Sequence, residues 1–323
     1  MKSLIIGGSG FVGSYLAHHL VHAGHKVSIT ERRHGSCSIL GIPIYNLDIL
    51  DKENMKRILE KERPKYIFHL ASQSSVASSW ENPEQTIDIN IKGSLNLLHT
   101  VHELNQEARI LLVGSSEEYG KMITKEIPVG EDCKVRPENI YAVTKVCQNM
   151  IGRIYAQAYG MDIVMIRAFN HTGPNQLPIF VIADFCRQVA QIEAGKREPV
   201  VKVGNLEVRR DFTDVRDIVR AYALLAEKGK SGETYNVGSG HAVCLREVLQ
   251  MILNQATVKI HVEPDPEKLR PLDVSVVQAD ISKIKCATGW EPVIGLEKTI
   301  KDTLDYWRVF EGKSDRTDKS KGM

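Results

Sequence analysis

The chain has 323 residues, of which 42% are hydrophobic and 25% are charged, and its formal net charge is +2. This length suffices for one large domain or two smaller ones, and the composition is that of an ordinary globular protein. A net charge so close to zero excludes binding to nucleic acid or to a membrane surface through overall charge. The first apolar stretch breaks at Gly7. It is too short for a secretory signal or a membrane-spanning helix, so we expect a cytoplasmic protein.

Short β-rich runs and longer helical segments alternate through the first half of the chain. The predicted strands are Ser3–Ile6, Lys26–Thr30, Ile42–Asn46, Tyr66–Leu70, Arg109–Gly114 and Asp162–Arg167. The predicted helices are Val12–Ala23, Lys52–Glu60, Ile87–Glu103 and Tyr141–Tyr159. Strands separated by helices pair in parallel through right-handed crossovers. The sequence therefore predicts an α/β fold of the Rossmann type, a doubly wound parallel sheet whose ligands bind beyond the carboxyl ends of the strands.

The character of the chain changes after residue 170, where prolines interrupt shorter and less regular elements. We expect residues 1–170 to form the sheet domain and residues 171–323 a smaller C-terminal domain. The segment 211–238 is predicted to return to the first domain. The tail 312–323 is charged and aperiodic, so we expect it to be disordered.

Cysteine and histidine patterns give no sign of a disulfide framework or a metal site. No C-x-x-C pair occurs among the six cysteines Cys37, Cys133, Cys147, Cys186, Cys244 and Cys286. We therefore expect inert or partly buried thiols. His18 and His22 share a helix face, but no Cys, Asp or Glu stands near them at ligand spacing, so no metal is predicted.

A glycine-rich turn joins the first strand to the first helix. It fits G-x-G-x-x-G through Gly8, Gly10 and Gly13, and G-x-x-G-x-x-G through Gly7, Gly10 and Gly13. Glycines allow the backbone to turn tightly and to approach a pyrophosphate, which then lies at the amino end of the helix. The sequence therefore predicts a dinucleotide site. Its phosphate-binding residues are predicted to be Gly7, Gly10, Phe11, Val12 and Gly13.

The end of the second strand bears on the choice of cofactor. Glu31 stands about 20 residues beyond the glycines, where a carboxylate holds a ribose hydroxyl of NAD. Arg32 and Arg33 follow it, and guanidinium groups bind the extra phosphate of NADP. The sequence thus predicts NAD or NADP and leaves the preference open.

Tyr141 and Lys145 form a Y-x-x-x-K motif that places a phenol and an ammonium group on one face of a predicted helix. The pKa of a free tyrosine is about 10, and a nearby positive charge lowers it toward the working range of a proton donor. Ser115 ends the strand upstream and can share a substrate oxygen with Tyr141. These three residues are the predicted catalytic group.

The motifs resemble, in their order along the chain, those of the extended short-chain dehydrogenases/reductases. They are Gly7/Gly10/Gly13, Asp48, His69-Leu-Ala-Ser72, Asn90, Ser115 with Tyr119-Gly120, and Tyr141 with Lys145. Three later segments resemble one branch, the GDP-4-keto-6-deoxy-D-mannose reductases, which make GDP-D-rhamnose. These segments are Arg167–Pro174, Gly204–Asp214 and Tyr235–Gly238.

The resemblance implies roles for individual residues. Besides the glycine turn, the strand end and the catalytic group, the implied cofactor contacts are Asp48, Ile49, Leu70, Ala71, Ser72 and Asn90. The implied contacts to a sugar nucleotide are Ser74, Ser115, Ser116, Glu117, Asn170, Val181, Arg210 and Arg270. Arg210 and Arg270 are expected to bind the diphosphate, which suits the forked geometry of guanidinium groups.

Glu117 leaves an alternative open, because it stands where sugar-nucleotide 4,6-dehydratases carry a catalytic glutamate. The stretch Asn170–Pro174 resembles the reductases instead. The main interpretation is reduction of the C4 ketone of a GDP-4-keto-6-deoxyhexose. A GDP-mannose 4,6-dehydratase, a 4-epimerase with tightly bound NAD, and a non-catalytic nicotinamide-sensing regulator are the alternatives.

The resemblance also implies a homodimer formed through the helices Ile87–Glu103 and Tyr141–Tyr159. Both carry apolar residues on more than one face: Leu95, Leu98, Val146, Met150 and Ile154.

Overall fold

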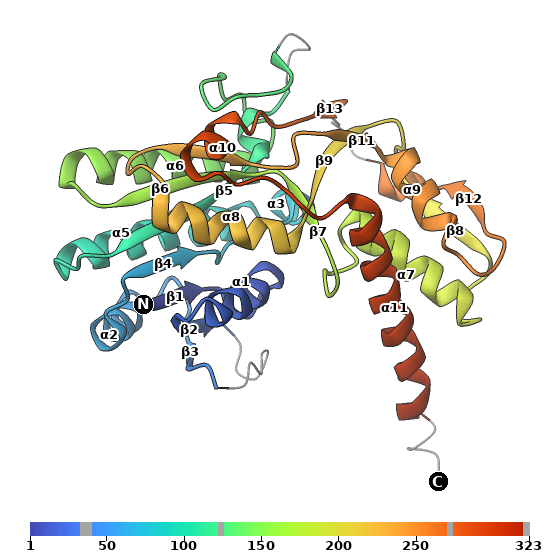
Figure 1. The fold of residues 1–323 in the computed structure, drawn as a ribbon, viewed down its shortest axis with the longest axis horizontal. Helices are drawn as coiled ribbons and strands as arrows, with labels where there is room; N and C mark the ends of the chain where they lie inside the picture. The colour runs from blue at the N-terminus through green and yellow to red at the C-terminus, as the bar shows by residue number, and fades with distance from the viewer. Residues whose placement is uncertain (33–40, 122–125, 270–273, 319–323) are drawn as a thin grey trace.

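A seven-stranded parallel sheet forms the centre of the larger part of the molecule (Figure 1). The computed structural model describes residues 1–32, 41–121, 126–269 and 274–318. The strand order is β3-β2-β1-β4-β5-β6-β10. The strands are β1 (Lys2–Ile6), β2 (Lys26–Glu31), β3 (Ile44–Asn46), β4 (Tyr66–His69), β5 (Arg109–Ser115), β6 (Ile163–Ala168) and β10 (Thr234–Val237). The predicted doubly wound sheet is confirmed.

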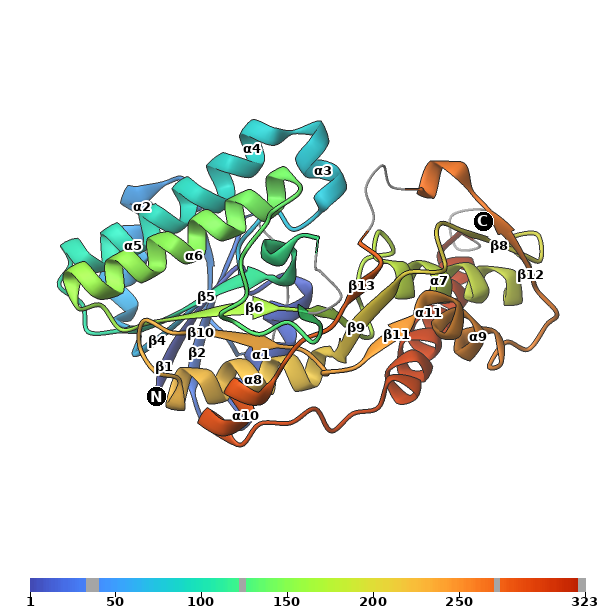
Figure 2. The ribbon, with the colours of Figure 1, turned by 90° about the horizontal axis from the view of Figure 1, so that it is seen from above.

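Helices cover both faces of this sheet (Figure 2). On one face lie α1 (Phe11–His22), α8 (Val215–Lys228) and α10 (Ser282–Thr288), and on the other lie α2 (Lys52–Glu62), α5 (Gly93–Glu103) and α6 (Ile140–Tyr159). Strand side chains alternate between the faces, so Ile5 packs with α1 and α8, whereas Leu4 and Ile6 pack with α2 and α5. Burial on both faces explains the continuous apolar runs within this sheet, at residues 4–6, 66–68 and 110–112.

The predicted helix Ile87–Glu103 is interrupted in the structure. The short helices α3 (Val76–Glu81) and α4 (Pro83–Ile87) lead into a π-helical turn, Asp88–Lys92, before α5 begins. The extra residue in this turn directs Asn90 inward, where its Oδ1 accepts the Gln73 N–H at 2.8 Å. Asn90 Nδ2 also donates to Thr144 Oγ1 at 2.9 Å. The turn thus ties the loop after β4 to α6.

A second apolar cluster lies beside the sheet, at the right of Figure 1. It is formed mainly by α7 (Val181–Glu193), β8 (Val200–Val203), α9 (Leu245–Leu253) and α11 (Leu296–Asp318). The exposed strand β12 (His261–Pro264) pairs with β8, and the 3-10 turn Pro266–Lys268 follows it. A small sheet connects this cluster to the larger part. Its strands are β7 (Asn170–Thr172), β9 (Arg209–Asp214), β11 (Ala242–Cys244) and β13 (Val276–Val277).

The chain crosses between the two parts more often than the predicted division implies. β10 pairs with β6, so the segment near residue 234 lies in the large sheet. Residues 282–290 also pack there, with Trp290 buried and its Nε1 donating to the Asp217 carbonyl at 3.0 Å. The boundary at residue 170 stays a prediction.

The end of the chain is described as far as residue 318. Helix α11 runs from Leu296 to Asp318. Disorder of the tail from residue 312 stays a prediction. Residues 319–323 lie outside the described part of the chain.

The described cysteines are free thiols: Cys133, Cys147, Cys186, Cys244 and Cys286. Cys37 lies outside the described residues. His22 Nδ1 lies 2.7 Å from the His18 carbonyl oxygen, so this ring bonds to its own helix. Within the ranges given above, none of the helices has both the length and the apolar character needed to cross a bilayer.

Candidate active site

A cavity of about 650 Å³ opens beyond the carboxyl ends of β1, β4, β5 and β6. The strand order reverses between β1 and β4, which is where doubly wound sheets bind their ligands. Most of the predicted site residues line it: Gly7, Gly10, Phe11, Val12, Gly13, Arg32, Asp48, Ile49, Leu70, Ala71, Ser72, Ser74, Ser115, Ser116, Glu117, Tyr141, Lys145 and Asn170.

The glycine turn forms a close cradle at the amino end of α1. Gly7 has a φ of +84°, and a Cβ there would lie 2.8 Å from the Ala71 nitrogen. A Cβ on Gly13 would lie 2.6 Å from the Gly7 oxygen, so only glycine lets α1 pack against the turn. The N–H of Gly7 is held by Thr30 Oγ1 at 3.1 Å. Phe11, Val12 and Gly13 begin α1 and line the cavity, and the amino end of a helix there fits the pyrophosphate of a dinucleotide.

The residues after β2 and β3 form one end of the cavity. Arg32 is exposed and lines it together with Asp48 and Ile49. Glu31 is only 3% exposed and is not among the lining residues. Arg33 lies outside the described residues. Of the two predicted contacts at the end of β2, Arg32 therefore lines this end and Glu31 does not.

The predicted catalytic group meets at the other end. Ser115 ends β5, and its Oγ caps the following 3-10 turn Ser116–Tyr119 by accepting the Glu117 N–H at 3.2 Å. Tyr141 lies in the first turn of α6 and forms a hydrogen bond with Ser115. Lys145 lies one turn further, its Nζ 5.8 Å from the Tyr141 ring centroid. Lys145 Nζ donates to the Val113 carbonyl at 2.8 Å and to Gln148 Oε1 at 3.2 Å.

Burial controls the protonation of this group. Burial raises the pKa of Tyr141 above its ordinary value, the hydrogen bond with Ser115 lowers it, and Glu117 and Glu118 raise it. That Lys145 and a bound nicotinamide lower the pKa of Tyr141 stays a prediction. Burial also lowers the pKa of Lys145 to about 8. Tyr141 is thus held as a neutral phenol, the form that donates a proton.

The neighbouring residues Glu117 and Glu118 lie in different surroundings. Glu117 lines the cavity, and its Oε2 accepts from Asn139 Nδ2 at 3.0 Å. Glu118 is fully buried and pairs with Arg167, with Nε to Oε2 at 2.9 Å. Glu118 Oε1 also accepts the Ser115 N–H at 3.1 Å. Only Glu117 is therefore placed to meet a substrate.

Four predicted contacts do not line the cavity, and one cannot be placed. Asn90 and Glu31 are buried behind its wall, and Val181 begins α7 beside it. Arg210 lies on β9 of the small sheet, and its Nη1 donates to the Val274 carbonyl at 2.6 Å. Arg270 lies outside the described residues.

Several lining residues were not predicted: Thr30, Gln73, Ser75, Phe169, His171, Gln176, Ile179, Phe180 and Tyr222. The residues among them that adjoin a predicted one could have been found from their position at the end of a strand. Tyr222 gave no such signal, because it falls on the apolar face of α8, where its spacing is that of a core residue.

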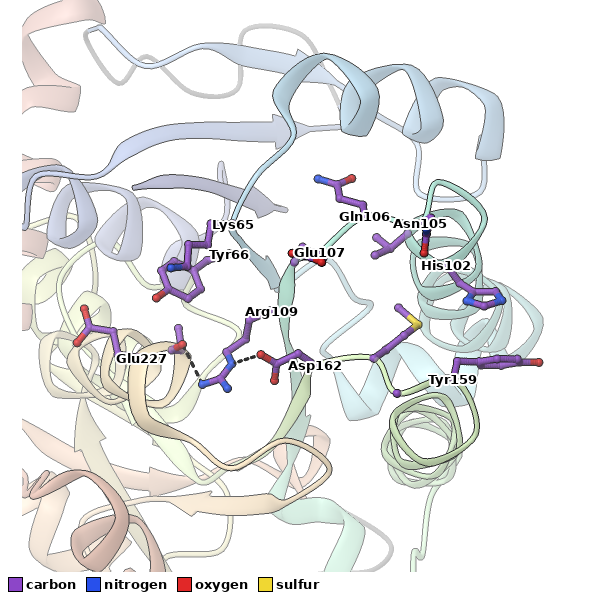
Figure 3. Close-up of a pocket in the computed structure, with 15 residues that line it drawn as sticks. Lys65, Tyr66, His102, Asn105, Gln106, Glu107, Arg109, Tyr159, Asp162 and Glu227 are labelled. Carbon is purple, nitrogen blue, oxygen red and sulfur yellow. Dashed lines mark hydrogen bonds and ion pairs between the residues drawn. The ribbon is translucent and has the colours of Figure 1, made fainter.

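A second hollow of about 530 Å³ lies at the opposite edge of the sheet, near the amino ends of β4, β5 and β6 (Figure 3). Arg109 crosses it, its Nε donating to Asp162 at 2.8 Å and its guanidinium reaching the Ala226 carbonyl. None of the predicted site residues lines it. The predicted chemistry is thus confined to the first cavity.

Residues 4–303 match the family described as GDP-mannose 4,6 dehydratase. The chain belongs to this family. A GDP-6-deoxy-D-mannose reductase of Pseudomonas aeruginosa is 31% identical over 95% of this chain and 97% of its own length. These relatives confirm that the chain is an NAD(P)-dependent oxidoreductase of the extended short-chain dehydrogenase/reductase type.

Two solved structures resemble this member of the GDP-mannose 4,6-dehydratase family along nearly the whole chain. The structure of RMD from Pseudomonas aeruginosa complexed with NADPH has 30% identity and a TM-score of 0.86, covering 96% of this chain and 100% of that one. The Thermus thermophilus UDP-glucose 4-epimerase complex with NAD has 29% identity and a TM-score of 0.85, covering 95% and 99%. Both structures hold a nicotinamide cofactor, which is NADPH in the first and NAD in the second.

Proposed function

We propose that this protein uses NADPH or NADH to reduce the C4 ketone of a GDP-4-keto-6-deoxyhexose, giving a GDP-6-deoxyhexose such as GDP-D-rhamnose. The observation that carries this proposal is the meeting of Ser115, Tyr141 and Lys145 in the cavity that the glycine turn also lines. The relative named as a GDP-6-deoxy-D-mannose reductase supports the choice of substrate.

Each residue has a distinct part in the proposed reaction. When bound, the reduced nicotinamide supplies the hydride. Tyr141, kept neutral by burial, donates its proton to the oxygen that becomes an alkoxide. Ser115 orients that oxygen through its hydroxyl, which already bonds to Tyr141. Lys145, anchored on the Val113 carbonyl, holds the cofactor ribose from the same helix as Tyr141.

Two parallel reactions with purified protein test the proposal. One contains GDP-4-keto-6-deoxymannose with NADPH or NADH, and the other contains GDP-mannose alone. Consumption of reduced cofactor only in the first is the expected result. Because Arg32 and not Glu31 lines the adenosine end, we expect faster consumption of NADPH than of NADH. A keto sugar formed from GDP-mannose without net cofactor use would contradict the proposal.

Dehydration of GDP-mannose is the second candidate, and the position of Glu117 favours it. Its carboxylate lines the cavity beside Ser115, where a base for water elimination would lie. For the reductase, which needs no such base, we expect Glu117→Gln to retain ketone reduction within roughly threefold, measured by NADPH consumption. If Glu117→Gln abolished a turnover of GDP-mannose found in the native enzyme, the dehydratase would replace the reductase.

We also propose a homodimer formed through α5 and α6. Their outer faces carry exposed apolar residues, with Leu95 39%, Met150 59% and Ile154 57% exposed. Leu98 is fully buried and contributes nothing to that surface. A large apolar patch of this kind marks an interface between protein chains.

Charges on this face are expected to separate the proposed dimer. The double variant Met150→Lys/Ile154→Lys should elute as a monomer in size-exclusion chromatography with light scattering, whereas the native protein elutes as a dimer. Val309→Lys, on an exposed apolar position of α11, is the control and should remain dimeric. A monomeric native protein would rule out the dimer. No nucleic-acid or membrane partner is proposed, and a cytoplasmic location stays a prediction from the sequence.

A further inference from the structure

Gln148 is a buried polar residue on α6, one turn beyond Lys145. Tyr141, Lys145 and Gln148 stand at positions i, i+4 and i+7 and share the buried face of this helix. Gln148 is only 2% exposed, and it is not among the described residues that line the cavity. A glutamine is seldom buried so deeply unless its amide is paired. The partners of this amide therefore indicate what the residue does.

Gln148 and Lys145 form a closed set of hydrogen bonds with one carbonyl of β5. Lys145 Nζ donates to the Val113 oxygen at 2.8 Å and to Gln148 Oε1 at 3.2 Å. Gln148 Nε2 donates to the same Val113 oxygen at 3.2 Å. Val113 lies on β5 just before Ser115 and lines the cavity. Three bonds among three groups thus fix the place of the ammonium group beside the end of β5.

This arrangement leaves one direction of the ammonium group for a ligand. A lysine ammonium has three N–H donors, and two of them have partners in the described part of the chain. Lys145 itself lines the cavity, so the third donor is available to a ligand there. A free lysine side chain loses much rotamer freedom when it binds, and an anchored one loses less.

We propose that Gln148 is a positioning residue that holds the Lys145 ammonium group in place for the ribose of the cofactor. This inference rests on the role of Lys145 in the proposed function. Gln148 acts only through its neighbours: its oxygen accepts from the ammonium group, and its NH₂ group holds the Val113 carbonyl. A hydrogen bond from an ammonium group is stronger than one from a neutral amine, so Gln148 also favours the charged form of Lys145.

The other titratable groups around Lys145 allow its charge to be followed by pH. Burial lowers the pKa of Lys145 to about 8, and Glu118, which is paired with Arg167, opposes this effect. Burial and the nearby ammonium group lower the pKa of His69 to about 3, so this ring stays neutral. Burial raises the pKa of Tyr141 above its ordinary value, so its phenol is still protonated where Lys145 loses its charge. A change in cofactor binding near pH 8 therefore reports on Lys145.

Titration with NADPH at a series of pH values, followed by fluorescence, tests this inference without any sugar substrate. In the native protein we expect affinity to begin to fall near pH 8, where Lys145 loses its proton, and Kd to rise about 10-fold. Gln148→Met keeps an unbranched side chain but removes the strong acceptor, so the fall should begin about one pH unit lower. Below this range, where Lys145 is charged in both proteins, the two Kd values should agree within about threefold.

Gln148→Glu is a second variant with an expected shift of the opposite sign. Its carboxylate would lie beside the ammonium group and favour the charged form, so the fall in affinity should begin at a higher pH than in the native protein. A residue that only fills space would not give shifts of opposite sign in the two variants.

Gln188→Met is the matched control. Gln188 lies on α7 and is 3% exposed, and its amide bonds to Asp184 and to the backbone of Lys202. It is not among the described residues that line the cavity. We expect this variant to unfold at a lower temperature, as Gln148→Met should, because both lose buried hydrogen bonds. Its affinity for NADPH should begin to fall at the native pH.

Three results would overturn the inference: a native pH dependence in Gln148→Met, an equal shift in Gln188→Met, or a shift of the same sign in both Gln148 variants. A native protein that binds neither NADPH nor NADH would overturn the inference and the proposed cofactor together. Native binding of NADPH without ketone reduction would remove the proposed substrate alone. Opposite shifts in the two Gln148 variants would then still support the inference.

Discussion

Phenylalanine in place of Tyr141 is expected to lower turnover by ~10²-fold or more while leaving cofactor affinity nearly unchanged. The phenol is the neutral acid of the site, and the ring without its hydroxyl has no proton to give. The ring itself remains to fill its place in α6, so the cavity keeps its shape. Steady-state consumption of NADPH with the 4-keto sugar gives turnover, and calorimetry gives the Kd of the cofactor.

Tyr15→Phe is the control for this variant. Tyr15 lies on α1 outside the cavity lining, and its hydroxyl donates to the Pro174 carbonyl at 3.0 Å. Its loss should leave turnover within about twofold of the native rate, since the phenol touches no reacting group. Unchanged turnover in Tyr141→Phe would remove Tyr141 from the mechanism. A parallel loss in cofactor affinity would show that the hydroxyl also contributes to cofactor binding.

The sheet could be predicted from the sequence because its signal is local. Several buried strands carry continuous apolar runs, and helices with their own periodicity separate most of the predicted strands. The alternation of strand and helix then fixes parallel pairing, so the cavity at the carboxyl ends follows. Ser115 and Gly7 could be placed in it because Ser115 ends a strand and Gly7 directly follows one.

Residues that depend on packing between distant elements could not be placed in this way. Arg210 suits a diphosphate by its chemistry, but its guanidinium donates to the carbonyl of Val274, which precedes β13 and is 64 residues away in sequence. Asn90 reaches inward only because a π-helical turn interrupts its helix. The pKa of Tyr141 depends on burial, which no helical spacing reveals.

The limit of prediction from the sequence is clearest for two adjacent residues. Glu117 and Glu118 are chemically identical in the sequence, yet one faces the cavity and the other is fully buried. The geometry of the 3-10 turn after β5 directs them to different surroundings, and the position of Arg167 on β6 gives Glu118 its partner. Only the folded structure separates a candidate substrate contact from a supporting ion pair.

Removing the carboxylate of Glu118 is expected to lower the free energy of unfolding by about 3–5 kcal/mol. Glu118→Ala leaves the Arg167 guanidinium, whose side chain is only 10% exposed, without its anion. It also leaves the buried Ser115 N–H without its acceptor. Water cannot replace either lost partner, because Glu118 is fully buried. Urea unfolding followed by circular dichroism measures the change.

An exposed ion pair provides the comparison that isolates burial. Glu207 pairs with Arg246 at the surface, where the two side chains are 69% and 65% exposed, so Glu207→Ala should cost less than about 1 kcal/mol. Glu118→Gln keeps an oxygen for the Ser115 N–H but removes the charge, and its cost should fall between the two. Equal costs for Glu118→Ala and Glu207→Ala would contradict the argument. Costs that increase from Glu207→Ala through Glu118→Gln to Glu118→Ala would show that the Glu118–Arg167 ion pair supports both the fold and the position of Ser115.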